Sequence, residues 1–148
     1  TNNYQSYSSG TERKIYKYDN NIKILPLICF EIIYSGSLSN KNDYNFIVNI
    51  SEDGWFGESI GPDQHFAKSI FRAVENNTFF LRSANKGVSA IIDNKGKIIK
   101  QLDRNEAGTI EFNVPLIKSN KNKNDLIFFA LLITYLLFFF IYRKKNDK

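Results

Sequence analysis

Few residues of this chain can carry redox, metal or nucleophilic chemistry. The 148 residues include one cysteine, one histidine, one tryptophan and no methionine. A lone cysteine excludes an internal disulfide, and a single histidine offers no ligand set for zinc. We therefore expect no metal and no other cofactor. Since the sequence begins at Thr1 and has no methionine anywhere, we expect it to be a fragment of a longer polypeptide.

No segment outside the C-terminal region has a concentration of one charge sign. The formal net charge is +5, but Lys and Arg are interleaved with Asp and Glu. Proteins that bind nucleic acid usually present a basic patch or stripe. The sequence also has no phosphate-binding loop and no nucleic-acid module, so we expect no nucleic-acid partner.

One long apolar run lies near the C-terminus. Residues 126–142 have no charge, and at about 1.5 Å per residue they span about 25 Å as a helix. The run is apolar on every face, and the rest of the chain is too small to enclose it. We predict a transmembrane helix at 126–142, preceded by a linker at 118–125 and followed by a basic tail at 143–148. The tail has slightly more basic residues than the linker, which favours a cytoplasmic C-terminus.

The soluble part, residues 1–117, alternates short apolar strands with one amphipathic helix. Residues 1–18 are polar and are predicted to form a loop. Pro26 falls within a strand, where proline is tolerated only at an edge or a bulge. The elements that we predict are strands at 22–28, 44–50, 78–84, 88–92, 98–102 and 109–114, a helix at 62–77, a structured loop at 51–61, a tight turn at 85–87 and a hairpin turn at 93–96.

Cys29 lies directly after the first apolar strand, within LPLICFEII at 25–33. A short helix is predicted to begin near Glu31. A sharp turn from strand to helix exposes a side chain and directs backbone N–H groups at a substrate, as nucleophiles in α/β enzymes require. A lone cysteine in an apolar run is nevertheless more often an inert core residue. These residues alone leave both interpretations open.

Four motifs follow Cys29 within sixty residues. They are NISEDGWFG at 49–57, GPDQH at 61–65, RAVE at 72–75 and LRSANKG at 81–87. In this order they resemble the C-terminal half of a nitrilase-superfamily domain. More narrowly they resemble the apolipoprotein N-acyltransferase family, membrane enzymes that add the third acyl chain to bacterial lipoproteins. The resemblance covers about residues 22–96. It implies an α+β fold, the C-terminal half of an αββα sandwich, followed here by one transmembrane helix.

The resemblance also implies roles for several residues near Cys29. Cys29 would be the nucleophile, and Glu31 would complete a Cys-aromatic-Glu triplet that holds the active-site loop. Phe30 departs from the family pattern, which usually has Tyr there. The superfamily's Glu base and oxyanion-stabilising Lys lie before the cysteine, and no motif upstream of Cys29 matches them. We therefore expect the isolated chain to be inactive.

Other residues of the motifs have structural alternatives. Trp55 and Phe56 would line an acyl-chain pocket or enter the membrane interface, or would simply pack in the core. His65 is expected to cap the start of the helix rather than to bind a metal. Arg72 and Glu75, three residues apart on the helix, are expected to form an ion pair.

The function implied by the resemblance is acyl transfer through a Cys29 thioester. A membrane phospholipid would donate the acyl chain, and the N-terminal amine of a diacylglyceryl-cysteine lipoprotein would accept it. The resemblance places the protein in the bacterial inner membrane, with its catalytic part outside the cytoplasm. The alternatives are an amidase or nitrilase for small molecules, which has no use for a membrane helix, and a non-catalytic, membrane-tethered remnant of a split gene.

Overall fold

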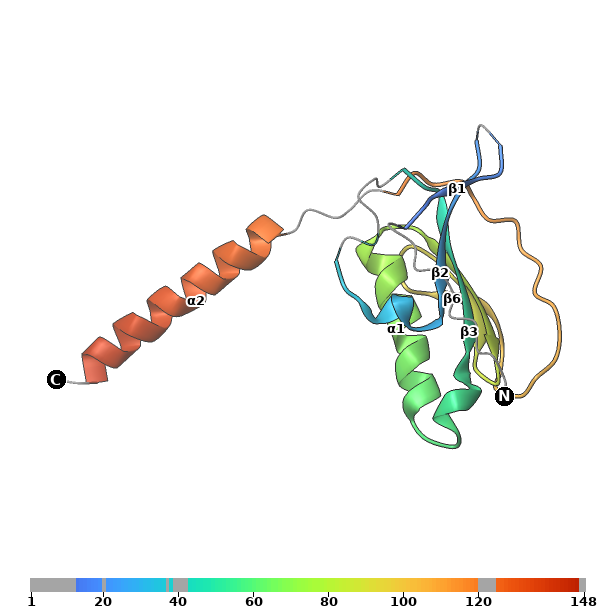
Figure 1. Cartoon of the computed structure of the whole chain (residues 1–148). Coiled ribbons are helices and arrows are strands. Elements are labelled where there is room, and N and C mark those ends of the chain that lie inside the picture. The colour runs from blue at the N-terminus through green and yellow to red at the C-terminus, as the bar shows by residue number, and fades with distance from the viewer. Residues whose placement is uncertain (1–12, 20, 37, 39–42, 120–124, 147–148) are drawn as a thin grey trace, which may run out of the picture.

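The computed structural model describes residues 13–19, 21–36, 38, 43–119 and 125–146. Its centre is a mixed sheet (Figure 1), and the strands follow one another across it in chain order. The strand β2 pairs in parallel with β3, and β3 with β4, whereas the remaining pairs are antiparallel. The strands are β1 (Tyr16–Lys17), β2 (Lys23–Ile28), β3 (Phe46–Glu52), β4 (Phe79–Asn85), β5 (Ser89–Ile92) and β6 (Ile98–Leu102).

The strand β1 lies in a segment that we predicted to be a loop. A turn closed by the Asp19 carboxylate, which accepts the backbone N–H groups of Asn21 and Ile22, brings β1 back against β2. Because β1 pairs only with Lys23 and Ile24, β2 is an edge strand beyond that point. Pro26, which has no N–H to donate, therefore occupies an edge position, as its sequence context predicted.

One face of the sheet is covered by helix α1 (Gly61–Glu75), close to the predicted bounds. Alternate strand residues point toward this helix, and the register aligns Leu25, Ile47 and Phe80 across three strands. Each of these three side chains is fully buried, and Ala73 of α1 packs in the same cluster. The apolar face of α1 and the inward-facing residues of the strands thus pack in one core.

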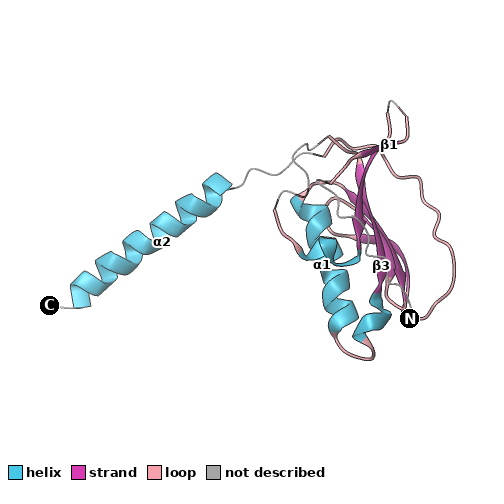
Figure 2. Ribbon diagram, viewed as in Figure 1, coloured by secondary structure: helices cyan, strands magenta, loops and turns pink. Residues whose placement is uncertain are grey.

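Among the described residues, no helix lies on the opposite face of the sheet (Figure 2). Ile28 and Ile50 are register partners on this face, and they are 70% and 63% exposed. A sheet layer covered by helices on one side only corresponds to half of an αββα sandwich. The α+β fold class predicted from the sequence is confirmed.

Residues 109–114 do not form the strand that we predicted. After β6 the chain turns back along the sheet instead of adding a strand to its edge. Phe112 stacks on Phe79 with ring centroids 6.3 Å apart, and the N–H of Ser119 donates to the carbonyl of Tyr44. The segment therefore follows the open face through the contacts of Phe112 and Ser119 with the sheet domain, although its sequence has a high β propensity.

The last element that the structure describes is helix α2 (Asp125–Asn146). Its stretch Leu126–Lys144 has a mean hydropathy of 2.2, is not buried by the rest of the protein, and is long and apolar enough to cross a membrane. The helix continues past residue 142, so the basic tail begins as helix. Ser119 is buried and bonded to Asn76, which places it with the sheet domain, whereas residues 120–124 of the predicted linker lie outside the described residues.

Candidate active site

Cys29 occupies a strained backbone position where β2 ends. It is the first residue of the 3₁₀ helix η1 (Cys29–Ile33), and its φ angle is +46°. The left-handed region costs a non-glycine residue about 1–2 kcal/mol, so the surroundings must hold it there. Its side chain is partly exposed. The sharp strand-to-helix turn predicted from the sequence is present.

Three side chains hold the backbone on either side of this turn. The Glu31 carboxylate accepts the N–H of Ile28 at 2.7 Å. The Asn49 amide donates to the carbonyl of Leu27 at 3.1 Å, and His65 Nε2 lies 3.3 Å from the carbonyl oxygen of Cys29. These contacts come from η1, β3 and α1, so the turn is fixed from three sides.

Beneath the turn lies a network of buried polar side chains, centred on Asp53 at the start of the 3₁₀ helix η2 (Asp53–Phe56). Asp53 Oδ1 accepts from Ser51 Oγ at 2.7 Å and lies 2.9 Å from His65 Nδ1. Asp53 Oδ2 accepts from Arg82 Nη2 at 2.6 Å. A second guanidinium nitrogen of Arg82 donates to Asn49 Oδ1 at 2.5 Å. Every one of these side chains is at least nine-tenths buried.

Electrostatics favour an ionised Asp53 in this network. Burial by itself would raise its pKa, but the hydrogen bonds from His65 and Ser51 and the charge of Arg82 outweigh burial and lower the pKa to about 2. Burial lowers the pKa of Arg82, and the Asp53 carboxylate opposes that shift. Since arginine keeps its proton in proteins, the two form a buried ion pair.

Aromatic rings surround the outer side of the turn. Phe30 stacks on the His65 ring with centroids 5.2 Å apart and lies 5.7 Å from the ring of Phe56. Trp55 is 86% exposed, so packing in the core of this chain is excluded. The structure thus gathers Phe30 and Phe56 around His65 next to Cys29, and leaves the Trp55 ring in solvent.

His65 does not cap helix α1, contrary to our prediction. It is the fifth residue of the helix, and its ring points back at the network beneath Cys29. The predicted pair of Arg72 and Glu75 is confirmed, with 2.9 Å between Nη2 and Oε1. Arg72 also donates to the carbonyl of Tyr34, which ties η1 to α1.

Of the basic residues before Cys29, Lys23 lies at the far end of β2 and pairs with Asp43. Arg13 Nε lies 3.5 Å from Glu31 Oε1, whereas the N–H of Ile28 donates to Oε2. Among the described residues no cluster of His, Cys, Asp and Glu is arranged to hold a metal ion.

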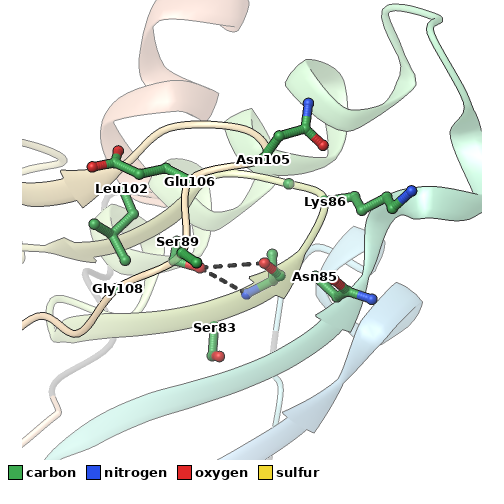
Figure 3. Close-up of a pocket in the computed structure, with 11 residues that line it drawn as sticks. Ser83, Asn85, Lys86, Ser89, Leu102, Asn105, Glu106 and Gly108 are labelled. Atoms are coloured by element: carbon green, nitrogen blue, oxygen red, sulfur yellow. Dashed lines mark hydrogen bonds between the residues drawn. The ribbon is translucent and has the colours of Figure 1, made fainter.

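A separate pocket of about 550 Å³ lies beside the turn between β4 and β5 (Figure 3). Ser83, Asn85 and Lys86 line one side, and Asn105 and Glu106 from the segment after β6 line the other. Cys29 is not among its lining residues. The tight turn predicted at 85–87 is at its rim, where Lys86 has a φ angle of +55°.

Sequence reasoning did not single out Ser51, Asp53 and Arg82 as parts of the site. One signal was available, because Arg82 lies in a strand whose neighbours are apolar. A guanidinium buried there requires an acidic partner, and Asp53 follows the adjacent strand at the same edge of the sheet.

Comparison with known proteins places these features in a family. The family model for carbon-nitrogen hydrolases matches residues 5–120. The chain is 39% identical over 147 residues to an apolipoprotein N-acyltransferase of Rickettsia bellii, covering 93% of this chain and 30% of that protein. It is 40% identical over 141 residues to the one of Rickettsia typhi, covering 88% and 28%. The chain therefore spans less than a third of the length of these curated relatives.

Two solved structures share the fold at low identity. A CN-hydrolase superfamily protein of Xanthomonas campestris, solved with an arsenic adduct in its active site, has a TM-score of 0.55 at 18% identity, covering 68% of this chain and 43% of that chain. An amidase of Nesterenkonia, solved after Michael addition of acrylamide at its active-site cysteine, has a TM-score of 0.50 at 12% identity, covering 66% and 41%.

Proposed function

The chain belongs to the carbon-nitrogen hydrolase family, and we propose that it is the C-terminal part of an apolipoprotein N-acyltransferase in which Cys29 is the nucleophile. The observation that carries this proposal is the position of Cys29, held at a φ angle of +46° where β2 passes into η1. Strained backbone is concentrated at active sites because the surrounding contacts can fix a reactive group there. An inert core cysteine needs neither the strain nor the contacts that maintain it.

In the first half-reaction the Cys29 thiolate attacks the carbonyl carbon of a phospholipid acyl ester. The tetrahedral intermediate collapses, its carbon–oxygen bond breaks, and the lysophospholipid alkoxide leaves with a proton. The product on the protein is a thioester at Cys29. A thiolate suits the two half-reactions together, because it is a strong nucleophile toward the ester and a good leaving group from the thioester.

In the second half-reaction the α-amino group of a diacylglyceryl-cysteine lipoprotein attacks the thioester carbonyl. An amide bond forms, the carbon–sulfur bond breaks, and Cys29 is regenerated. The base that accepts the protons and the cation that stabilises the oxyanion come, in this proposal, from polypeptide that precedes Cys29. Glu31 keeps the turn in place through Ile28 and is not assigned to proton transfer.

Helix α2 and the exposed aromatic residues favour lipid substrates over small amides. Both substrates of the proposed reaction lie in a membrane, and α2 would keep the catalytic domain beside it. Phe30 in η1 is 48% exposed and Trp55 in η2 is 86% exposed, which suits contact with an acyl chain. We assign residues 1–117 to the catalytic domain, outside the cytoplasm, and 143–148 to the cytoplasmic side.

The test uses the complete acyltransferase with Cys29→Ala and Cys29→Ser substitutions. The unsubstituted enzyme is incubated with a radiolabelled phospholipid, and the peptide that contains Cys29 is examined for a hydroxylamine-sensitive acyl group. We expect this adduct and transfer of the label to a lipoprotein, and neither in the two variants. Transfer of palmitate by the Cys29→Ala enzyme would refute the proposal.

A small-molecule amidase is the second candidate function. The same enzyme preparation distinguishes it from an acyltransferase. Release of ammonia from simple amides, with no acyl adduct from phospholipid, would favour the amidase. Absence of both activities in a complete and folded enzyme would favour a non-catalytic remnant.

A further inference from the structure

The Ser51 hydroxyl lies between the Cys29 sulfur and the Asp53 carboxylate. Its oxygen is 3.7 Å from Cys29 Sγ and 2.7 Å from Asp53 Oδ1. Ser51 is only 6% exposed, so water has little access to compete for either contact. Ser51 is on the same face of β3 as Asn49, two residues earlier, and this alternation directs both side chains at the turn that carries Cys29.

A single hydroxyl proton cannot be donated to both neighbours at once. When Cys29 is a neutral thiol, the hydroxyl donates to the Asp53 carboxylate and its oxygen accepts from the thiol. When Cys29 is a thiolate, the hydroxyl turns and donates to the sulfur. Asp53 tolerates this loss because Arg82 Nη2 still donates to Oδ2 and His65 Nδ1 still lies 2.9 Å from Oδ1.

We infer that Ser51 is a positioning residue for the nucleophile, and that its hydroxyl donates a hydrogen bond to the Cys29 thiolate and fixes the direction of the sulfur. The inference rests on the proposed role of Cys29, since an inert thiol needs no such partner. Among the described residues, the charged or titratable groups of the elements packed around the turn are Glu31 in η1, Asp53 in η2, His65 in α1 and Arg82 in β4. Those groups contact the backbone of the turn or one another. Among the described residues, Ser51 is the one that makes a hydrogen bond to the sulfur itself.

The experiment measures alkylation of Cys29 by iodoacetamide in the 148-residue chain in detergent micelles. Cys29 is the only cysteine, so the observed rate belongs to one thiol. Ser51→Ala removes the hydroxyl, and Ser51→Thr retains it in a residue that suits a strand. Ser69→Ala is the matched control, because Ser69 is a fully buried serine of α1 whose hydroxyl has no hydrogen-bond partner among the described residues.

A hydrogen bond to a charged group is worth enough to change an equilibrium about tenfold. We therefore expect alkylation of Ser51→Ala at pH 7 to be about tenfold slower than that of the parent. The difference should narrow at high pH, where the thiol is ionised without help. Ser51→Thr and Ser69→Ala should stay within about twofold of the parent at pH 7. Convergence at high pH separates loss of thiolate stabilisation from a purely structural defect, which would alter the rate at every pH.

Three results would overturn the inference. The first is an unchanged alkylation rate in Ser51→Ala. The second is an alkylation rate in Ser51→Ala that equals the rate of the guanidinium-unfolded chain at every pH. The third is failure of Ser51→Thr to keep the reactivity of the parent. Alkylation does not depend on acyl transfer, so this test is separate from that of the proposed function. If Cys29→Ala still transferred palmitate, the proposed function would fail even though Ser51 affected the thiol as expected.

Discussion

The α-carbon of Gly87 lies directly against the carboxylate of Asp53, and a β-carbon on Gly87 would overlap it. The two residues come from different parts of the sheet edge: Gly87 from the turn after β4, and Asp53 from the start of η2. Their contact closes the space around the buried ion pair of Asp53 and Arg82. Glycine is needed here because of this close approach.

Gly87→Ala is therefore expected to lower the free energy of unfolding by about 1–3 kcal/mol, the usual cost of overpacking a buried site. Urea titration followed by circular dichroism measures the change. Gly108→Ala is the control, because its β-carbon would meet only the flexible Leu102 side chain, at 3.2 Å. Equal losses in the two variants would contradict the steric role of Gly87.

Asp53 should make the stability of the chain depend on pH in the acid range. Its pKa of about 2 lies below the ordinary value of 3.8, so ionised Asp53 favours the folded state. This stabilisation is complete above about pH 4 and is lost as the pH falls through about 2. Between pH 5 and pH 2 it amounts to about 2 kcal/mol.

Asp53→Asn should remove this part of the pH dependence. The free energy of unfolding of the variant is expected to be lower at pH 7, because Arg82 loses its anionic partner. Between pH 5 and pH 2 it should fall by about 2 kcal/mol less than that of the parent. Denaturant titrations at each pH provide the measurement. Glu58→Gln, which alters an exposed carboxylate, should keep the parent slope. If the free energy of unfolding of Asp53→Asn depends on pH as that of the parent does, then Asp53 has the same pKa in the folded and the unfolded state.

The two faces of β3 should respond differently to the same substitution. Ile47 is fully buried under α1, whereas Ile50 is 63% exposed on the open face. Ile47→Thr is expected to cost about 2–4 kcal/mol, since apolar contact is lost and a hydroxyl is buried. Ile50→Thr should change the free energy of unfolding by no more than about 0.5 kcal/mol. A large effect at Ile50 would mean that another part of the protein covers this face in solution.

Helix α2 should hold the chain in a bilayer. Arginine near the centre of a span costs about 2.5–3.5 kcal/mol of insertion. Leu136→Arg should therefore move a large fraction of the chain into the supernatant of an alkaline carbonate extraction, whereas Leu126→Arg, at the first residue of the span, should leave it in the pellet. Extraction of the unsubstituted chain would exclude a membrane span.

The orientation of α2 is a separate expectation. We expect the C-terminal end of the helix on the cytoplasmic side, because basic residues are retained there. A reporter enzyme fused after Lys148 that works only in the cytoplasm should be active. Activity of a reporter that requires export would reverse the assignment.

Local patterns in the sequence predicted most of the helices and strands. The periods of the strands and of α1 predicted the positions of those elements, and the spacing of Arg72 and Glu75 predicted their ion pair. The turn at Cys29 also followed from a strand that ends beside a short helix. Each of these depends on residues a few positions apart, where backbone geometry alone fixes which side chains meet.

The residues that lie beneath and around that turn are brought together by long-range packing. Arg82 finds Asp53 29 residues away because β3 and β4 pair in register, and His65 reaches Cys29 because α1 packs across the sheet. Residues 109–114 have a strand-like sequence, yet they lie along the open face, and Trp55 stays exposed. Such contacts depend on strand register and on how a helix is placed over a sheet, and no short stretch of sequence contains that information.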